Sequence, residues 1–90
     1  MFTVKLYGRS ASSGAYATKI VEASEVDVYI LRPGELQEVA VHRSGVDREA
    51  FYVADPTLPR PLTGFSPEVE FWEMAYVENS AGKTTHSVRF

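Results

Sequence analysis

The sequence predicts an all-β or β-rich α+β fold: a small antiparallel sheet or partly closed barrel of about five to six strands, joined by hairpins and one long proline-rich connection. Short stretches in which apolar and polar residues alternate recur along the chain, and turn residues separate them. β-branched and aromatic residues, which suit pleated strands, fill these stretches. A chain of 90 residues has the size of one domain, so we expect a single domain over residues 1–90 with a thin core.

The first strand is predicted over residues 2–8, where Phe2, Val4 and Leu6 alternate with Thr3, Lys5 and Tyr7. It is expected to end at Gly8. The segment "GRSASSG" that follows is small and polar, and it predicts a flexible surface loop. Residues 15–25 leave helix and strand both open, because "AYATKIVEASE" also fits three helical turns.

A hairpin is predicted next. "VDVYIL" alternates as a strand, "RPGE" supplies a type II turn with Pro33 and Gly34 at its centre, and "LQEVAVH" returns as the partner strand. The chain is expected to break at "RSGVDRE" and to resume as a short strand in "AFYVA". "DPTLPRPLTGFSPE" holds four of the five prolines, and proline lacks the N–H that a strand ladder needs, so this segment is predicted to be a long connection.

The stretch "AGKTT" looks like the tail of a phosphate-binding loop, but its surroundings exclude that motif. Val77 stands where a glycine is required, and too few residues follow Thr85 to form the helix that should come next. We expect a hairpin instead, with "NSAG" as a four-residue loop, Gly82 in the left-handed conformation and Glu78 opposite Lys83.

The predicted register of this hairpin assigns two faces. One, with Phe71, Ala75 and Val77, is expected to face the core. The other carries an aromatic stripe of Trp72, Met74 and Tyr76, with Arg89 placed over Trp72 as a cation–π pair. We expect either the proline-rich segment or a binding partner to cover this stripe.

The residue types argue against catalysis and metal binding. Without cysteine there is no thiolate ligand or Cys nucleophile, and His42 and His86 alone do not make a zinc site. His42, Ser44 and Asp47 are too close along one turn for a catalytic triad. Glu68 and Glu70 share one side of a predicted strand and are interpreted as a solvated edge. We therefore expect no enzymatic activity, no cofactor and no metal.

Charge bears on the choice of partner. Nine basic and twelve acidic residues leave a net charge of −3, which does not favour direct nucleic-acid binding. Between Arg60 and Lys83 stand four glutamates and no basic residue, so we expect an acidic, aromatic surface suited to a basic groove on another protein. No signal-peptide pattern or long apolar run is present, and a soluble intracellular protein without membrane contact is expected.

The opening "MFTVKLYG" and the later "YVENSAGKTT" resemble small uncharacterised proteins carried by phages and prophages. The resemblance implies an accessory factor in the cytoplasm of a host cell. Anti-CRISPR proteins belong to this class, and they block a host surveillance complex by binding it stoichiometrically. The larger partner implied is a host protein or ribonucleoprotein complex.

The leading hypothesis is therefore a non-enzymatic inhibitor of a host defence complex. Its predicted partner-binding residues are Phe65, Glu68, Glu70, Trp72, Glu73, Met74 and Tyr76. Two alternatives stay open. One is a small binding module for an anionic ligand or nucleotide, which would use "GRSASSG" or "SAGKTT" with Arg9 or Lys83. The other is a self-assembling structural subunit or homodimer.

Overall fold

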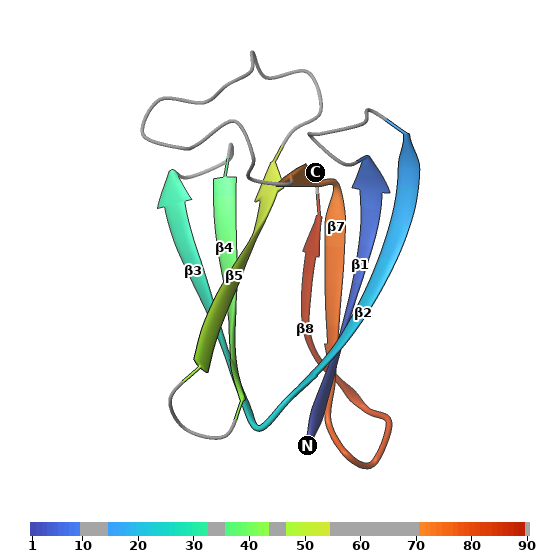
Figure 1. Ribbon diagram of the computed structural model, residues 1–90, viewed down its shortest axis with the longest axis vertical. Coiled ribbons are helices and arrows are strands. Elements are labelled where there is room, and N and C mark those ends of the chain that lie inside the picture. Colours follow the sequence, from blue (N-terminus) through green and yellow to red (C-terminus); the bar gives the residue numbers. More distant parts are fainter. Residues whose placement is uncertain (10–14, 33–35, 44–46, 55–70, 90) are drawn as a thin grey trace.

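The computed structural model describes residues 1–9, 15–32, 36–43, 47–54 and 71–89, and every element in these ranges is a β-strand. Sheet A consists of β1 (Phe2–Arg9), β2 (Tyr16–Ala23), β7 (Met74–Glu78) and β8 (Thr84–Arg89), in the order β2-β1-β7-β8. Sheet B consists of β3 (Glu25–Arg32), β4 (Leu36–Arg43), β5 (Asp47–Ala54) and β6 (Phe71–Trp72), in the order β3-β4-β5-β6. Figure 1 shows the two sheets as separate groups of strands.

The prediction of an all-β fold is confirmed, whereas the predicted strand count and single sheet are wrong. The described residues form seven strands of five residues or more, together with the two-residue β6, which pairs with β5 in parallel. Within these residues the two sheets are not closed into a barrel. All other strand pairs are antiparallel, as the succession of hairpins suggested.

Two short crossings carry the chain between the sheets. At Ser24 the chain passes from β2 to β3, and the Ser24 N–H and hydroxyl both donate to the backbone carbonyl of His42 at 2.9 and 2.7 Å. At Glu73 the chain passes from β6 to β7, and the Glu73 N–H donates to the Tyr7 carbonyl at 2.9 Å. The two crossings lie at opposite ends of β1, near Phe2 and near Tyr7, so the sheets are tied together at both ends (Figure 1).

The core lies between the apolar faces of the two sheets. Strand alternation sends every second side chain inward, and the resulting buried cluster contains Val4, Leu6, Val21, Ala23, Val39, Val41, Phe51, Val53, Trp72, Ala75, Val77 and Val88. Burying one such valine, leucine or phenylalanine side chain contributes about 1.5–3 kcal/mol, so this small cluster is the main source of stability. The predicted inward positions Val4 and Leu6 of the first strand are confirmed.

Residues 15–25, which the sequence left open between helix and strand, form β2 up to Ala23. The strand pairs with β1 along its whole length, from Arg9 opposite Tyr16 to Phe2 opposite Ala23. This pairing turns Ala17 and Val21 inward and Tyr16 and Ile20 outward. A helix would have put Tyr16, Ile20 and Ala23 on one side, whereas the ladder separates Ala23 from the other two.

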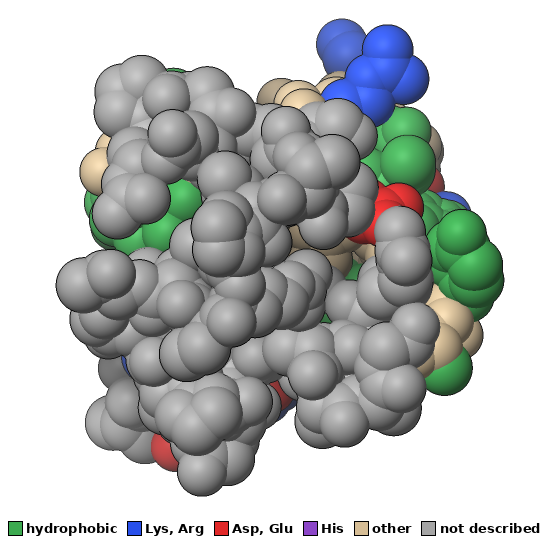
Figure 2. All heavy atoms as spheres, turned by 90° about the horizontal axis from the view of Figure 1, so that it is seen from above, with side chains coloured by type: hydrophobic (Ala, Val, Ile, Leu, Met, Phe, Trp, Pro, Cys, Tyr) green, Lys and Arg blue, Asp and Glu red, His purple; other side chains and the backbone are tan. Residues whose placement is uncertain are grey.

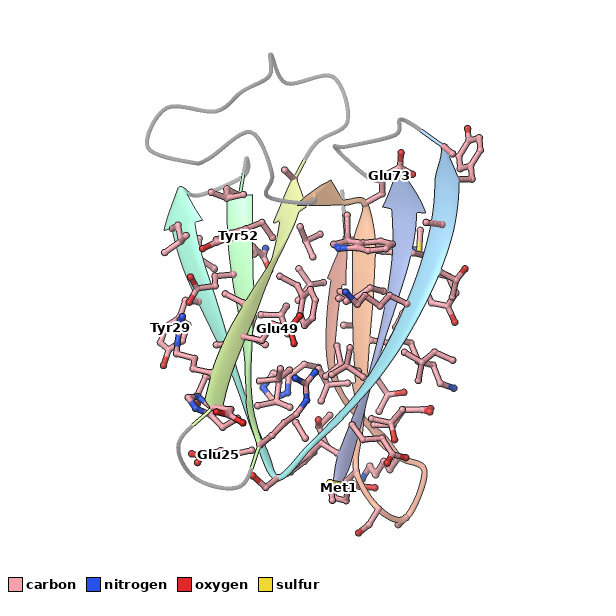
Figure 3. All side chains as sticks on the ribbon, in the orientation of Figure 1. Met1, Glu25, Tyr29, Glu49, Tyr52 and Glu73 are labelled. Atoms are coloured by element: carbon pink, nitrogen blue, oxygen red, sulfur yellow. The ribbon has the colours of Figure 1, made fainter. Side chains whose placement is uncertain are left out.

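Ion pairs connect the two sheets near β2. Lys19, on the inward side of β2, lies 4.0 Å from the Glu49 carboxylate and 5.2 Å from the centre of the Phe51 ring. Arg43 pairs with the same carboxylate at 2.8 Å, and its Nε donates to the Glu22 carbonyl at 3.4 Å. Glu49 lies between the two sheets (Figure 3), so it links β5 to both β2 and β4.

The β3–β4 hairpin is confirmed, with Val28 opposite Val39 and Tyr29 opposite Glu38. Its predicted turn residues, Pro33 and Gly34, lie outside the described residues. The expected break at "RSGVDRE" is shorter than predicted, because Arg43 still pairs with Asp47 at the start of β5. The proline-rich segment falls within residues 55–70, also outside the described part.

The C-terminal hairpin forms, but its register differs from the prediction. Glu78 is opposite Thr84 rather than Lys83, and Val77 is opposite His86. The cause is Asn79, whose Oδ1 accepts the N–H groups of Ala81 and Lys83 at 3.0 Å each, so that the loop includes Lys83. The prediction had Val77 opposite Thr84, so from Val77 the pairing moves by two residues, the same side chains of both strands stay inward, and Ala75 and Val77 are buried as predicted.

Among the described residues, no helix has the length and apolar character that crossing a membrane would require.

Candidate binding surface

The outer face of sheet A carries a cluster of large side chains. Strand register sets Tyr7 of β1 beside Met74 of β7, and Tyr76 of β7 beside Lys5 of β1. On the edge strand β2, Ile20 is opposite Lys5, and Tyr16 lies further along the same face. We call this surface the aromatic face, defined by Tyr7, Tyr16, Ile20, Met74 and Tyr76.

The centre of the aromatic face is ordered by direct contacts. The rings of Tyr7 and Tyr76 meet edge to face, with centroids 6.0 Å apart and an interplanar angle of 69°. The Tyr76 hydroxyl donates to the sulfur of Met74 at 3.6 Å. All three side chains are half-buried by these contacts, so they form a firm apolar platform.

The edge of the aromatic face is open. The Tyr16 residue is 81% exposed and Ile20 is 62% exposed, among the highest values for large hydrophobic residues in the described part of the chain. In the view from above, hydrophobic side chains gather on the side of the molecule where β2 lies (Figure 2). An exposed isoleucine beside a tyrosine platform is typical of contact surfaces for proteins.

Charges on this face are largely balanced. Lys5 Nζ lies 3.0 Å from Glu78 Oε1, and the hydrogen bond to Glu78, supported by its negative charge, raises the pKa of Lys5. Glu22 and Arg89 also point to the outer side of sheet A by register. The face therefore offers no excess of positive charge among the described side chains, which disfavours a phosphate backbone as its ligand.

The predicted partner-binding residues are only partly brought together. Met74 and Tyr76 share the aromatic face, and Glu73 stands half-buried at the crossing just before β7. Phe65, Glu68 and Glu70 lie outside the described residues.

Trp72 does not belong to the predicted stripe. It lies on β6, paired with Val53 of sheet B, and it is only 2% exposed within the core cluster. The crossing at Glu73 interrupts the strand, so the alternation that placed Trp72 with Met74 does not continue through it. Arg89 is opposite Met74 instead, which removes the predicted cation–π pair with Trp72.

Sequence reasoning missed Tyr7, Tyr16 and Ile20 as members of the surface. The signal was present in the alternation of "YATKIVEA", which puts Tyr16 and Ile20 on one side of a strand. It was not decisive, because the same residues also fit one side of a helix.

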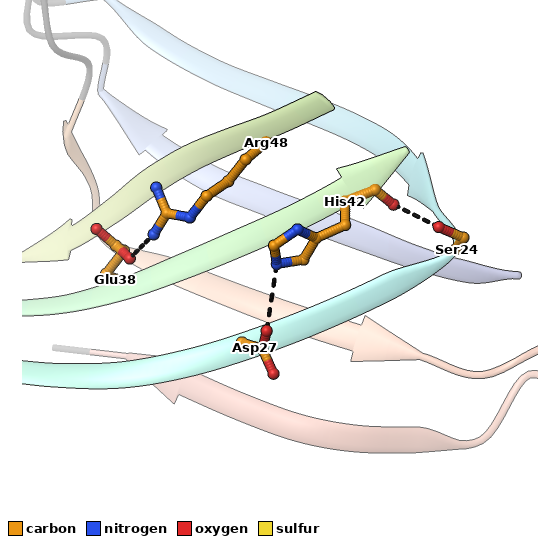
Figure 4. Close-up of polar contacts among 5 residues, drawn as sticks. All are labelled: Ser24, Asp27, Glu38, His42 and Arg48. Carbon is orange, nitrogen blue, oxygen red and sulfur yellow. Dashed lines mark hydrogen bonds and ion pairs between the residues drawn. The ribbon is translucent and has the colours of Figure 1, made fainter. Parts of the chain in front are cut away.

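A second cluster, of polar side chains, covers the outer face of sheet B (Figure 4). Arg48 pairs with Glu38, and Glu38 is 9% exposed. By register, the Arg48 side chain passes over the alanine pair Ala40–Ala50 to reach Glu38. Two small residues leave room for that path. His42 Nε2 lies 3.2 Å from Asp27 Oδ2.

Tyr52 completes the polar cluster. It is opposite Glu38 on β5, and burial raises its pKa, with the charge of Glu38 and a hydrogen bond to that carboxylate adding to the effect. The opposing influence is the positive charge of Arg48. The contacts of Glu38 with Tyr52 and with Arg48 are typical of a structural network.

The histidines do not assemble a catalytic or metal site in the described residues. His42 is held by Asp27, while Ser44 lies outside the described part and Asp47 faces Arg43. His86 is on the other sheet, with its Nδ1 3.2 Å from the Thr85 hydroxyl. No group of three or more potential metal ligands occurs among the described residues.

A cavity of about 360 Å³ lies at the β2–β3 corner, lined by Met1, Glu22, Ala23, Ser24 and Arg43. Arg43 lines it and is already engaged by Glu49 and by the Glu22 carbonyl. The Arg43 guanidinium is therefore not free to bind an anion in this cavity.

In the hairpin loop that resembles a phosphate-binding motif, backbone N–H groups donate to acceptors within the loop itself. The N–H groups of Ala81 and Lys83 bind Asn79 Oδ1, and the Gly82 N–H binds the Asn79 carbonyl at 2.9 Å. Gly82 has the expected left-handed conformation, with φ of 80°. The loop is thus a closed turn, which weighs against an anion site there.

No protein-family model matches the chain, and neither the curated proteins nor the solved structures that were searched contain a match.

Proposed function

We propose that the protein is a non-enzymatic binding domain that attaches to another protein through the aromatic face of sheet A. The observation that carries this proposal is the combination of an ordered Tyr7–Tyr76–Met74 platform with the exposed Tyr16 and Ile20 beside it. Tyrosine and methionine are enriched at protein interfaces. Tyrosine buries a large area at low entropic cost, and methionine adapts its shape to a partner. No described element lies over these five residues as a strand or helix.

The finer proposal concerns the partner. The resemblance to phage accessory proteins suggests a nucleic-acid-binding host defence complex, which the protein would inhibit by occupying its surface. The four glutamates between Arg60 and Lys83 favour a partner with a basic groove. Of these, Glu73 stands just before β7 and Glu78, which pairs with Lys5, is its last residue, next to the aromatic face.

The test compares matched variants in nuclease-treated host lysate. The protein is captured by affinity tag, and the recovered proteins are quantified by mass spectrometry for wild type, Ile20→Lys and Ile30→Lys. Ile20 and Ile30 are 62% and 63% exposed on different sheets, so the two changes are matched in chemistry and burial. We expect a stoichiometric partner to be lost with Ile20→Lys and kept with Ile30→Lys.

Equal recovery of every partner by both variants would refute the role of the aromatic face. A second arm titrates the purified protein with single-stranded oligonucleotides at physiological salt, where saturable binding would show a nucleic-acid ligand instead. For the finer proposal, the probe is a purified RNA-guided surveillance complex, and the readout is loss of its target-DNA binding on addition of the wild-type protein.

A further inference from the structure

Among the described residues, β3 is an edge strand of sheet B. β3 is eight residues long and pairs with β4 on one side, and no described strand pairs with its other side. Natural proteins usually protect such edges with charges, proline or a covering element, because the unpaired backbone groups can pair with another chain. Here Tyr29, Ile30 and Leu31 are 47%, 63% and 49% exposed in succession.

The side chains of β3 alternate between the two faces of sheet B, so they leave its edge accessible to a further strand in the plane of the sheet. Val26, Val28 and Ile30 belong to the inward row of β3, whereas Asp27 and Tyr29 belong to the outward row. Tyr29 projects on the outer side of the molecule, beyond β3 (Figure 3). A strand added at this edge would extend both rows.

The residue pattern of β3 is complementary to itself. In an antiparallel pair of two identical strands related by a two-fold axis through Val28, Tyr29 is opposite the second copy's Asp27, and Ile30 is opposite its Val26. Such an axis, perpendicular to the sheet, keeps the inward rows of both copies on the same side. Apolar residues then meet on one face, and a hydroxyl meets a carboxylate on the other.

A register shift between Ile30 and Arg32 brings charged residues into the pairing of the two copies of β3. Ile30 pairs with Gln37 and Arg32 pairs with Leu36, so Leu31 is an extra residue. Counted along the strand with the same shift, Arg32 falls at the register position opposite Glu25 of the second copy, which sets residues of opposite charge against each other twice per dimer. An axis through Asp27 would instead set two like charges against each other and leave the exposed Ile30 without a partner in the second copy's β3.

We propose that a second copy of this chain binds along β3 in antiparallel fashion, joining the two copies of sheet B into one continuous sheet. The interface is isologous, as expected for a two-fold dimer. It uses a different sheet from the aromatic face and does not depend on the binding function proposed above. An extended segment of an unrelated protein is the competing occupant of this edge.

The experiment measures the dimer dissociation constant by sedimentation equilibrium, at protein concentrations from the low micromolar range to about 1 mM. Ile30→Lys should weaken the dimer about tenfold or more, because each interface would bury two added ammonium groups. Ile20→Lys, on sheet A, is the matched control and should leave the dissociation constant unchanged. Circular dichroism and thermal unfolding verify that both variants are folded.

Charge reversal tests the register. Glu25→Arg and Arg32→Glu should each weaken the dimer, since each sets like charges opposite one another twice. The double variant Glu25→Arg/Arg32→Glu restores opposite charges and should recover the wild-type dissociation constant. A protein that stays monomeric to about 1 mM overturns the proposal, as does a dimer that is insensitive to Ile30→Lys or that is not rescued by the double reversal.

Discussion

Gly8 and the backbone of Glu73 approach so closely that a Cβ on Gly8 would lie 2.5 Å from the Glu73 nitrogen. The same nitrogen donates its hydrogen to the Tyr7 carbonyl at 2.9 Å. This contact is where the chain crosses from sheet B to sheet A, so the absence of a side chain at Gly8 lets β1 hold the start of β7. Gly8 also has φ of 145°, a conformation that other residues rarely adopt.

Gly8→Ala should therefore destabilise the fold by roughly 2 kcal/mol or more, because strain and a backbone clash add. Gly82→Ala is the control: φ there is 80°, but nothing lies within 4 Å of the added Cβ, so its cost should be only about 1 kcal/mol. Urea unfolding of both variants measures the difference. Equal losses of stability would show that the contact with Glu73 is not important.

Trp72 is the single tryptophan, and it reports directly on the position that the structure assigns to it. Trp72 is 2% exposed, and its Nε1 has no hydrogen-bond partner among the described residues. It should therefore emit at a wavelength well below that of tryptophan in water and resist quenching by acrylamide. Unfolding in urea should move the emission to longer wavelength. A native spectrum typical of solvent-exposed indole would contradict the buried position and support an exposed stripe with Met74.

The pair between Arg48 and Glu38 should contribute measurably although it lies near the surface. Arg48→Met keeps the aliphatic stem over Ala40 and Ala50 but leaves a 9% exposed carboxylate without its cation. About half of the Arg48 side chain is exposed, which limits the expected loss to about 1 kcal/mol. A double-mutant cycle with Glu38→Gln isolates the coupling, and Arg89→Met on β8 serves as the exposed control. A coupling energy of zero would show that the pair is only a surface contact.

Tyr52 should make the fold sensitive to alkali. Its pKa is raised in the folded state, so the phenol is neutral in both states below the ordinary value of about 10, and stability there is unaffected. Above that pH the unfolded chain ionises Tyr52 more readily than the folded protein does, and stability falls as pH rises. Tyr52→Phe should remove part of this decline, measured by urea unfolding at a series of pH values between neutral and alkaline. An identical pH profile for the variant would exclude Tyr52 as the cause.

Part of the candidate surface could be predicted from the sequence, and part could not. Met74 and Tyr76 alternate correctly within β7, so their common face followed from a strand period of two. Trp72 was assigned to the same face by extending that period across Glu73, where the chain in fact changes sheets. A local pattern does not indicate that a strand ends when the interruption is a single residue held by the distant Tyr7 carbonyl.

The sequence by itself determined the β class, most strand segments and the residues that share a face, because these follow from local alternation and turn chemistry. Only the tertiary structure decided that the strands divide into two sheets, that residues 16–23 form a strand, and that Trp72 is buried in the core. These outcomes depend on pairing between distant segments, such as β1 with β7, and on the close approach of Gly8 to Glu73. Alternation places residues on two faces, but it does not show where the chain changes sheets, because that crossing is held by contacts with distant residues such as Tyr7.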